Sequence, residues 1–172
     1  MDSLSATLGQ GLLVYKAVQL KEAGKNLDEI AAWLEENKYH LVHNFTVDDL
    51  FHLHRGGRLS KTAAIVGTMI NLKPVLHVDD EGHLVMLSKV RGRKKSLIGL
   101  VDCMEKQLGD WKDKNDIIFI SHGDCEEDAN YVAEKVKEKY QINTIIMNQV
   151  GATIGAHSGP GTMALFFVGD ER

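Results

Sequence analysis

The segment Ile154–Gly161 carries residues whose types and spacing suit the chemistry of anion binding. It reads Ile-Gly-Ala-His-Ser-Gly-Pro-Gly, so that an imidazole and a hydroxyl, from His157 and Ser158, lie among three glycines. Glycines let a backbone approach a ligand closely and turn its N–H groups inward. This pattern favours a carboxylate or a phosphate as the ligand. A β-turn in which His157 only caps backbone groups also fits the pattern.

The segment Arg55–Ser60 reads Arg-Gly-Gly-Arg-Leu-Ser and offers a second set of anion-binding groups. Guanidinium groups make paired hydrogen bonds to carboxylates and phosphates, and Ser60 is placed to start a helix whose N-terminus adds partial positive charge. The alternative is a loop with two solvated arginines. If both segments serve one anion, His157 should lie within side-chain reach of Arg58 or Arg55.

The segment Lys89–Lys95 concentrates basic residues, among them Arg91 and Arg93. It suits an acidic partner or a nucleotide phosphate, or else a solvated corner between a strand and a helix. Aromatic residues are not interleaved with the basic ones, so the run is not expected to bind nucleic acid.

The segment Ser121–Asp124 ends one expected strand and enters a helix, which is where open α/β sheets usually bind ligands. Asp124 is also suited to cap that helix, which is the structural interpretation of the segment.

Composition and spacing disfavour several functional classes. The net charge of −4 argues against non-specific nucleic-acid binding, and the longest apolar run, Met163–Val168, is far too short to cross a bilayer. His52 and His54 lie two residues apart on an expected helix, so they do not share a face for a metal. The two cysteines show no CxxC spacing, and the first residues show no secretory signal. We therefore expect a cytoplasmic protein with no membrane span, metal or cofactor.

Apolar periodicity and turn residues predict an α/β fold with a mixed parallel and antiparallel sheet flanked by helices. The expected opening is helix, helix, strand over residues 9–45, with Asn26 and Glu29 forming a capping box at the second helix. Thr46 and Ser60 are expected to cap two further helices, the second running to about Met69. Pro74 should place its strand at an edge or a bulge.

The next expected elements are a hairpin with strands at 72–78 and 83–91, a helix at 94–108 and a strand at 116–121. They are followed by a helix at 126–140, a strand at 143–149, a Gly-rich loop at 151–161 and a last strand at 162–168. Residues 72–168 should then form a five-strand sheet and residues 1–45 a separate lobe. One strand and two helices cannot close a sheet by themselves, so this opening segment either lacks a preceding portion or packs entirely on the rest of the chain.

Taken together, these motifs resemble the DegV family of bacterial fatty-acid-binding proteins. The resemblance is carried by Gly9–Val14, Phe45–Leu50, Arg55–Ser60, Asn71–Leu76, Lys89–Lys95, Ser121–Asp124 and the Gly155–Gly161 loop, in this order along nearly the whole chain.

The resemblance implies a two-domain protein that holds a long-chain fatty acid in a tunnel and presents its carboxylate to a separate ATP-dependent kinase subunit. On this basis, residues 1–45 are a remnant of the N-terminal domain and residues 46–172 are the C-terminal lipid-binding domain. In the family, the N-terminal domain supplies further Ser and Thr hydroxyls to the carboxylate.

The resemblance also assigns roles to residues. The residues expected around the carboxylate are His157, Arg58 or Arg55, Ser158 and Gly155. We expect Ile65, Met69, Leu165 and Phe167 to line the acyl tunnel. Arg91 and Arg93 are expected to dock on an acidic surface of the kinase subunit. The fatty acid is a ligand, so no cofactor is expected, and the protein itself is not expected to be an enzyme. The alternative is a small hydrolase or phosphotransferase with His157 as general base and Arg58 as electrophile.

Overall fold

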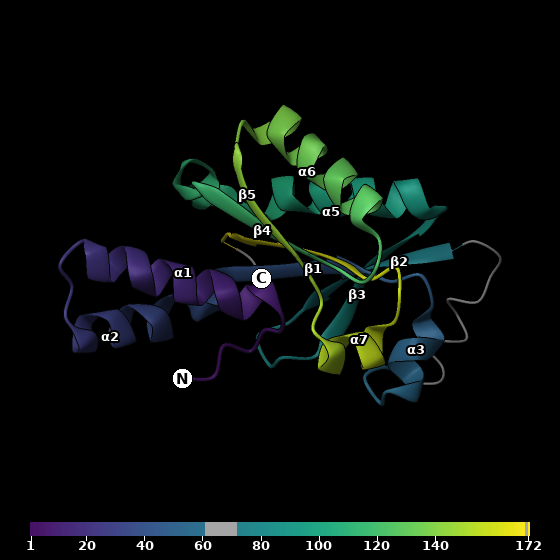
Figure 1. Ribbon diagram of the computed structural model, residues 1–172, viewed down its shortest axis with the longest axis horizontal. Helices are drawn as coiled ribbons and strands as arrows, with labels where there is room; N and C mark the ends of the chain where they lie inside the picture. The colour runs from purple at the N-terminus through teal and green to yellow at the C-terminus, as the bar shows by residue number, and fades with distance from the viewer. Residues whose placement is uncertain (61–71, 171) are drawn as a thin grey trace.

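The fold is built on one mixed six-stranded sheet with helices on both faces (Figure 1). The structure is a computed structural model that describes residues 1–60, 72–170 and 172. Its strands follow the order β3-β2-β1-β6-β4-β5 across the sheet. Their bounds are β1 Leu41–Thr46, β2 Leu72–Val78, β3 Leu84–Arg91, β4 Ile117–His122, β5 Thr144–Gln149 and β6 Met163–Val168.

Helices α5 (Arg93–Gln107) and α6 (Glu126–Tyr140) cover one face of this sheet. Helices α1 (Leu8–Glu22), α3 (Leu50–Arg55) and α7 (Ala152–Ser158) lie on the opposite face, and α2 (Leu27–Asn37) packs on α1. Short 3-10 helices span Lys38–His40 and Gly109–Lys114. The capping box expected at α2 is present, with Asn26 accepting from the Glu29 N–H and Glu29 accepting from the Asn26 N–H.

The predicted mixture of strand directions is confirmed. Strands β4 and β5 are parallel and joined by α6, whereas β1 pairs antiparallel with both β2 and β6, and β6 pairs antiparallel with β4. The predicted hairpin of β2 and β3 is also present. Pro74 lies in β2, which is not an edge strand, but the register with β3 shifts at the next residues, Val75 and Leu76, as a proline in a strand favours.

The expectation that residues 1–45 form a separate lobe is wrong. Strand β1 lies between β2 and β6 and pairs with β6 along its whole length, so a boundary at residue 45 would cut through a central strand. The sheet consequently has six strands instead of the five expected in residues 72–168. In this segment α1 buries Leu12 and Leu13 against the sheet, and α2 packs on α1. The assignment of these residues to the family's N-terminal domain stays a prediction.

Two local expectations are also corrected, and a third is not tested. Thr46 ends β1 instead of starting a helix, and Asp49 caps α3 by accepting a hydrogen bond from the Phe51 N–H at 2.8 Å. Asp124 does not cap α6, because it adopts a positive φ and Cys125 takes the N-cap position. The helix expected from Ser60 to Met69 lies outside the described residues.

The two faces of the sheet bury two separate cores. Strand β6 is buried throughout, and its side chains alternate between them. Leu165 and Phe167 join the core beneath α5 and α6, whereas Ala164 and Phe166 join the core beneath α1 and α3. No helix in the described part of the chain is long and apolar enough to span a membrane.

Candidate functional site

A cavity of about 180 Å³ lies on the face of the sheet that carries α1, α3 and α7. Its wall is predominantly apolar, and its polar groups come from β1, α7, the loop after α3 and the residues just before α1 and β6. Its lining residues are Ala6, Thr7, His43, Phe45, Leu53, Arg58, Leu84, Val150, Ile154, His157, Ser158, Thr162 and Ala164. Ligand sites of this character occupy roughly 300–1,000 Å³. The described residues therefore form a pocket of the right character whose volume lies below that range.

Arg58, His157 and Ser158 all line this cavity, so the segments Arg55–Ser60 and Ile154–Gly161 meet as the sequence predicts. The imidazole of His157 packs directly over Gly56. A Cβ on Gly56 would come within 2.5 Å of His157 Nδ1, closer than side chains tolerate. A glycine at this position is therefore needed to bring α7 against the loop that carries Arg58.

Residues 151–161 do not form the expected open loop. Ala152–Ser158 are helical, and His157 lies in the last turn of α7. Gly159 and Gly161 adopt left-handed φ values of 79° and 76°, which explains why glycine is needed there. Gly155 lies inside the helix and does not line the cavity, so its expected contact with the ligand is not supported by its position.

Both arginines of the segment Arg55–Ser60 are exposed, but they make different contacts. Arg55 is exposed and binds Asp49 and His52, at 3.4 and 3.0 Å, and it does not line the cavity. Arg58 lines the cavity and donates to the Gly56 carbonyl at 2.7 Å. Arg58 is therefore the arginine that can meet an anion in this cavity.

Two of the expected acyl-tunnel residues, Leu165 and Phe167, do not line this cavity. Leu165 and Phe167 are fully buried in the core on the opposite face of the sheet, so their assignment to the cavity is wrong. A shift of one residue along a strand moves a side chain to the other face, and the β6 residue that lines the cavity is Ala164. Ile65 and Met69 lie outside the described residues.

Sequence reasoning missed Thr7, which lines the cavity at the start of α1. Its φ of 52° is unusual for a β-branched residue, and such strain is often found at functional sites. The Thr7 hydroxyl accepts a hydrogen bond from Ser121 Oγ at 3.0 Å, which leaves its own proton free to donate. The resemblance quoted above begins at Gly9 and gave no signal for this residue.

His43 is the second missed residue. It lies in the middle of β1, lines the cavity and is 6% exposed. Burial, followed by the charges of Arg172 and His77, lowers the pKa of His43 to about 3. The imidazole is therefore neutral near pH 7.

The sequence matches the model of the DegV family, described as "Uncharacterised protein, DegV family", over residues 1–170. The chain belongs to the DegV family. A DegV domain-containing protein of Clostridium perfringens is 49% identical over 172 residues, which is 100% of this chain and 58% of that protein. The chain thus spans less than two thirds of the length of the curated DegV relatives that it matches.

Solved DegV structures share the fold. A DegV family protein from Thermus thermophilus, reported with fatty acid binding, is 29% identical with a TM-score of 0.83, covering 98% of this chain and 60% of that one. The Streptococcus pneumoniae Fatty Acid Kinase (Fak) B3 protein, solved with linoleic acid, is 24% identical with a TM-score of 0.87, covering 99% and 59%. At that identity the pneumococcal likeness concerns the fold.

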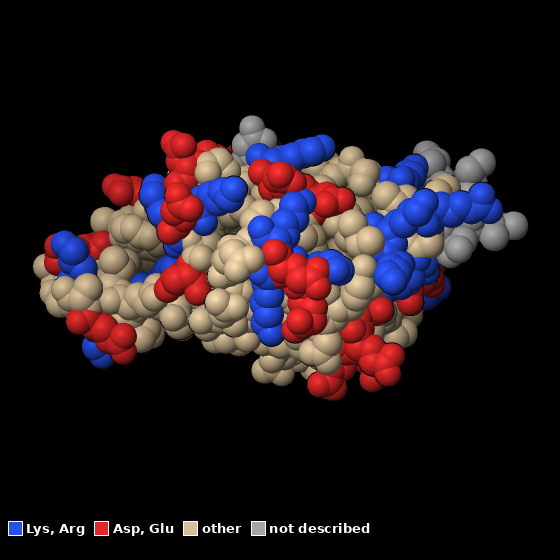
Figure 2. Space-filling model, turned by 90° about the horizontal axis from the view of Figure 1, so that it is seen from above, with Lys and Arg blue, Asp and Glu red and all other residues tan. Residues whose placement is uncertain are grey.

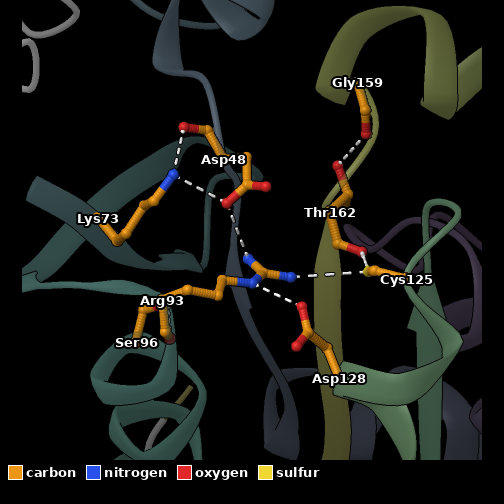
Figure 3. A network of polar contacts seen from close by, with 8 residues as sticks. All are labelled: Asp48, Lys73, Arg93, Ser96, Cys125, Asp128, Gly159 and Thr162. Atoms are coloured by element: carbon orange, nitrogen blue, oxygen red, sulfur yellow. Dashed lines mark hydrogen bonds and ion pairs between the residues drawn. The ribbon is translucent and has the colours of Figure 1, made fainter. Parts of the chain in front are cut away.

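In this DegV chain the basic run Lys89–Lys95 divides into exposed and buried parts. Arg91 is exposed at the end of β3, whereas Arg93 is 20% exposed and its Nε donates to Asp128 at 2.7 Å (Figure 3). Arg93 also lies 3.6 Å from Asp48, which binds Lys73 at 2.9 Å. The expectation that Arg93 docks a partner is therefore not supported by its position, because its guanidinium is engaged inside the protein.

The Arg93 cluster also supports the loop that leads into β6. Arg93 donates to Cys125 Sγ at 3.6 Å, and that thiol donates to the Thr162 carbonyl at 3.3 Å. Burial raises the pKa of the Cys125 thiol, which keeps it protonated as a donor. Thr162 lines the cavity and bonds the Gly159 carbonyl at 2.7 Å. Arg93 is thus connected to the cavity wall indirectly, through the hydrogen bonds of Cys125 and Thr162.

Proposed function

We propose that the protein binds a long-chain fatty acid in this cavity and presents its carboxylate to a separate ATP-dependent fatty acid kinase subunit. The observation that carries the proposal is the meeting of Arg58, His157 and Thr7 in a cavity whose remaining wall is predominantly apolar. An apolar wall accommodates an acyl chain, and a buried carboxylate requires hydrogen-bond donors and positive charge. Fatty acid binding by the T. thermophilus DegV protein is in line with this proposal.

The polar groups of the cavity suit a carboxylate in complementary ways. Arg58 supplies charge and paired N–H donors, and His157 supplies an imidazole from the last turn of α7. Thr7 is the N-cap residue of helix α1 and lines the cavity, and the N-terminus of this 15-residue helix adds partial positive charge. Ser158 donates its proton to the Ile154 carbonyl at 3.0 Å, so it is left as an acceptor.

The kinase partnership is proposed by analogy with the pneumococcal protein, which is named for a fatty acid kinase. In this proposal the DegV protein catalyses no reaction itself and uses no cofactor. It acts in the cytoplasm, where ATP is available to the kinase subunit. The alternative, a hydrolase with His157 as base, gains no support from Ser158, because the proton of this neighbouring hydroxyl is donated within α7.

The docking surface proposed for the kinase is the exposed part of the basic run. Lys89, Arg91, Lys94 and Lys95 are exposed. Figure 2 shows basic side chains gathered at the end of the molecule where β2 begins and α5 starts, while both signs are interspersed over the rest of this face. An acidic partner surface would complement this end of the protein.

Replacing Arg58 with alanine should weaken the binding of hexadecanoic acid by about 10- to 100-fold, because a charged hydrogen-bond partner of the carboxylate is lost. His157→Ala should weaken it in the same direction, with the fold intact. The measurement is displacement of a fluorescent fatty acid from each purified variant. Arg55→Ala is the matched control, since Arg55 is equally basic but lies outside the cavity. Parent-like binding by Arg58→Ala and His157→Ala, or an equal loss in Arg55→Ala, would contradict the carboxylate site.

A further inference from the structure

His43 places a polar group in the wall of the cavity, away from the carboxylate site. Its ring packs against those of Phe166 and Phe45, with centroids 4.5 and 5.5 Å away. These contacts hold the imidazole on the apolar face of the sheet. A leucine or phenylalanine would suit such surroundings better if the cavity only had to hold a hydrocarbon chain.

One nitrogen of His43 has a partner and the other has none among the residues that the structure describes. Nδ1 lies 3.2 Å from Ser5 Oγ, and no hydrogen bond of Nε2 is found in the described part of the chain. A neutral imidazole has one N–H donor and one acceptor, and Ser5 occupies one of these two positions. The free nitrogen belongs to a side chain that lines the cavity, where a ligand oxygen can pair with it.

The position of His43 along β1 fixes where that oxygen would lie. Thr46 pairs with Met163, next to the Thr162 end of the cavity, and His43 lies three residues further along the strand, which is roughly 10 Å. A second cavity of about 360 Å³ shares Ala6, His43 and Leu84 with the first. His43 therefore lies where the middle of a bound chain would pass, not where its carboxylate would sit.

The imidazole of His43 is neutral and supplies no charge of its own for an anion, and the nearby Arg172 guanidinium donates to the Leu4 carbonyl. His77 and Arg172 face it electrostatically from β2 and from the chain end, and Ser5 holds its Nδ1. His77 Nδ1 is paired with the Arg172 carbonyl at 3.1 Å. The neutral state of the imidazole removes a counter-charge for a second carboxylate. A hydroxyl both donates and accepts, so it satisfies the free nitrogen in either tautomer.

We propose that His43, held by Ser5, is a specificity-determining residue through which the protein selects fatty acids carrying a hydroxyl group in mid-chain. The inference rests on the proposed fatty-acid site and goes beyond it by naming the substrate class. An unsubstituted chain leaves the free nitrogen unpaired, whereas a mid-chain hydroxyl pairs it. A hydroxyl next to the carboxylate would not reach His43.

The test compares the binding of 10-hydroxyoctadecanoic, 2-hydroxyoctadecanoic and octadecanoic acids to the parent protein and to His43→Leu. The parent should prefer the mid-chain hydroxy acid over octadecanoic acid by about tenfold, as expected for one additional hydrogen bond. It should show no such preference for the 2-hydroxy acid. His43→Leu should lose the preference while still binding octadecanoic acid. His77→Leu, which alters a histidine outside the cavity lining, should retain it.

Equal binding of the 10-hydroxy and unsubstituted acids by the parent would overturn the role of His43 and leave the fatty-acid site standing. An unchanged preference in His43→Leu would overturn it as well. If none of the three acids binds the parent, the proposed function fails and the role of His43 fails with it. Should His43→Leu not fold, the parent's own preference still decides, and His43→Gln, which retains a polar side chain, should preserve that preference.

Discussion

Replacing Phe167 with alanine should lower the free energy of unfolding by about 3–5 kcal/mol, the cost of a large cavity in a packed core. The ring is fully buried beneath α5 and α6, on the side of the sheet away from the ligand cavity. The milder variant Phe167→Leu should therefore bind hexadecanoic acid as the parent does. Urea unfolding and fatty-acid displacement measure the two effects separately.

Ala164→Leu is the matched change on the other face of β6. It adds carbon atoms where Ala164 lines the cavity, and should reduce fatty-acid binding by at least about tenfold at a stability cost of about 1–3 kcal/mol. The opposite outcome, impaired binding in Phe167→Leu with parent-like binding in Ala164→Leu, would show that the cavity is not the acyl site.

Replacing Arg93 with alanine should destabilise the protein by about 1–3 kcal/mol, because Asp128 and Asp48 would lose a shared, largely buried cation. The matched change Arg91→Ala should stay within about 0.5 kcal/mol, since Arg91 is exposed. The measurement is urea unfolding of both variants.

The two arginines should also differ in partner binding. Arg91→Glu should slow association with the kinase subunit at low salt without loss of stability, because exposed charge attraction acts mainly on the association rate. Equal destabilisation by Arg91→Ala and Arg93→Ala would contradict the structural role of Arg93. An association rate unaffected by Arg91→Glu would remove the exposed basic run from the docking surface.

The order of the helices and strands could be predicted because it depends on local signals. The capping residues Asn26 and Glu29, the turn after β2 and the apolar strands β4 and β6 each carry their own signature. The central place of β1 could not be predicted from such signals. Its six residues include His43, Asn44 and Thr46, yet all are buried, because their neighbours come from distant parts of the chain. Asn44, for example, donates a hydrogen bond from its side-chain Nδ2 to Gln107 Oε1 at 2.6 Å, and the two residues are 63 positions apart in the chain.

The candidate site could be predicted where it depends on the residue types of a motif. It could not be predicted where it depends on the side of the sheet to which a side chain points. Arg58, His157 and Ser158 were found because their residue types suit an anion. The assignment of Leu165 and Phe167 to the acyl tunnel failed because every residue of this strand is apolar, so the sequence does not show which side chains point to which face of the sheet. The contrast between Arg91 and Arg93 likewise requires the position of Asp128, 35 residues away.

The most direct test of the proposed function is native mass spectrometry of the purified protein, before and after removal of lipid and reloading with hexadecanoic acid. We predict a species heavier than the bare chain by one fatty acid, which disappears on delipidation and returns on reloading. Its proportion should be lower in Ala164→Leu and Arg58→Ala. A protein that shows only the bare mass in every condition, or that retains lipid equally in both variants, would contradict it.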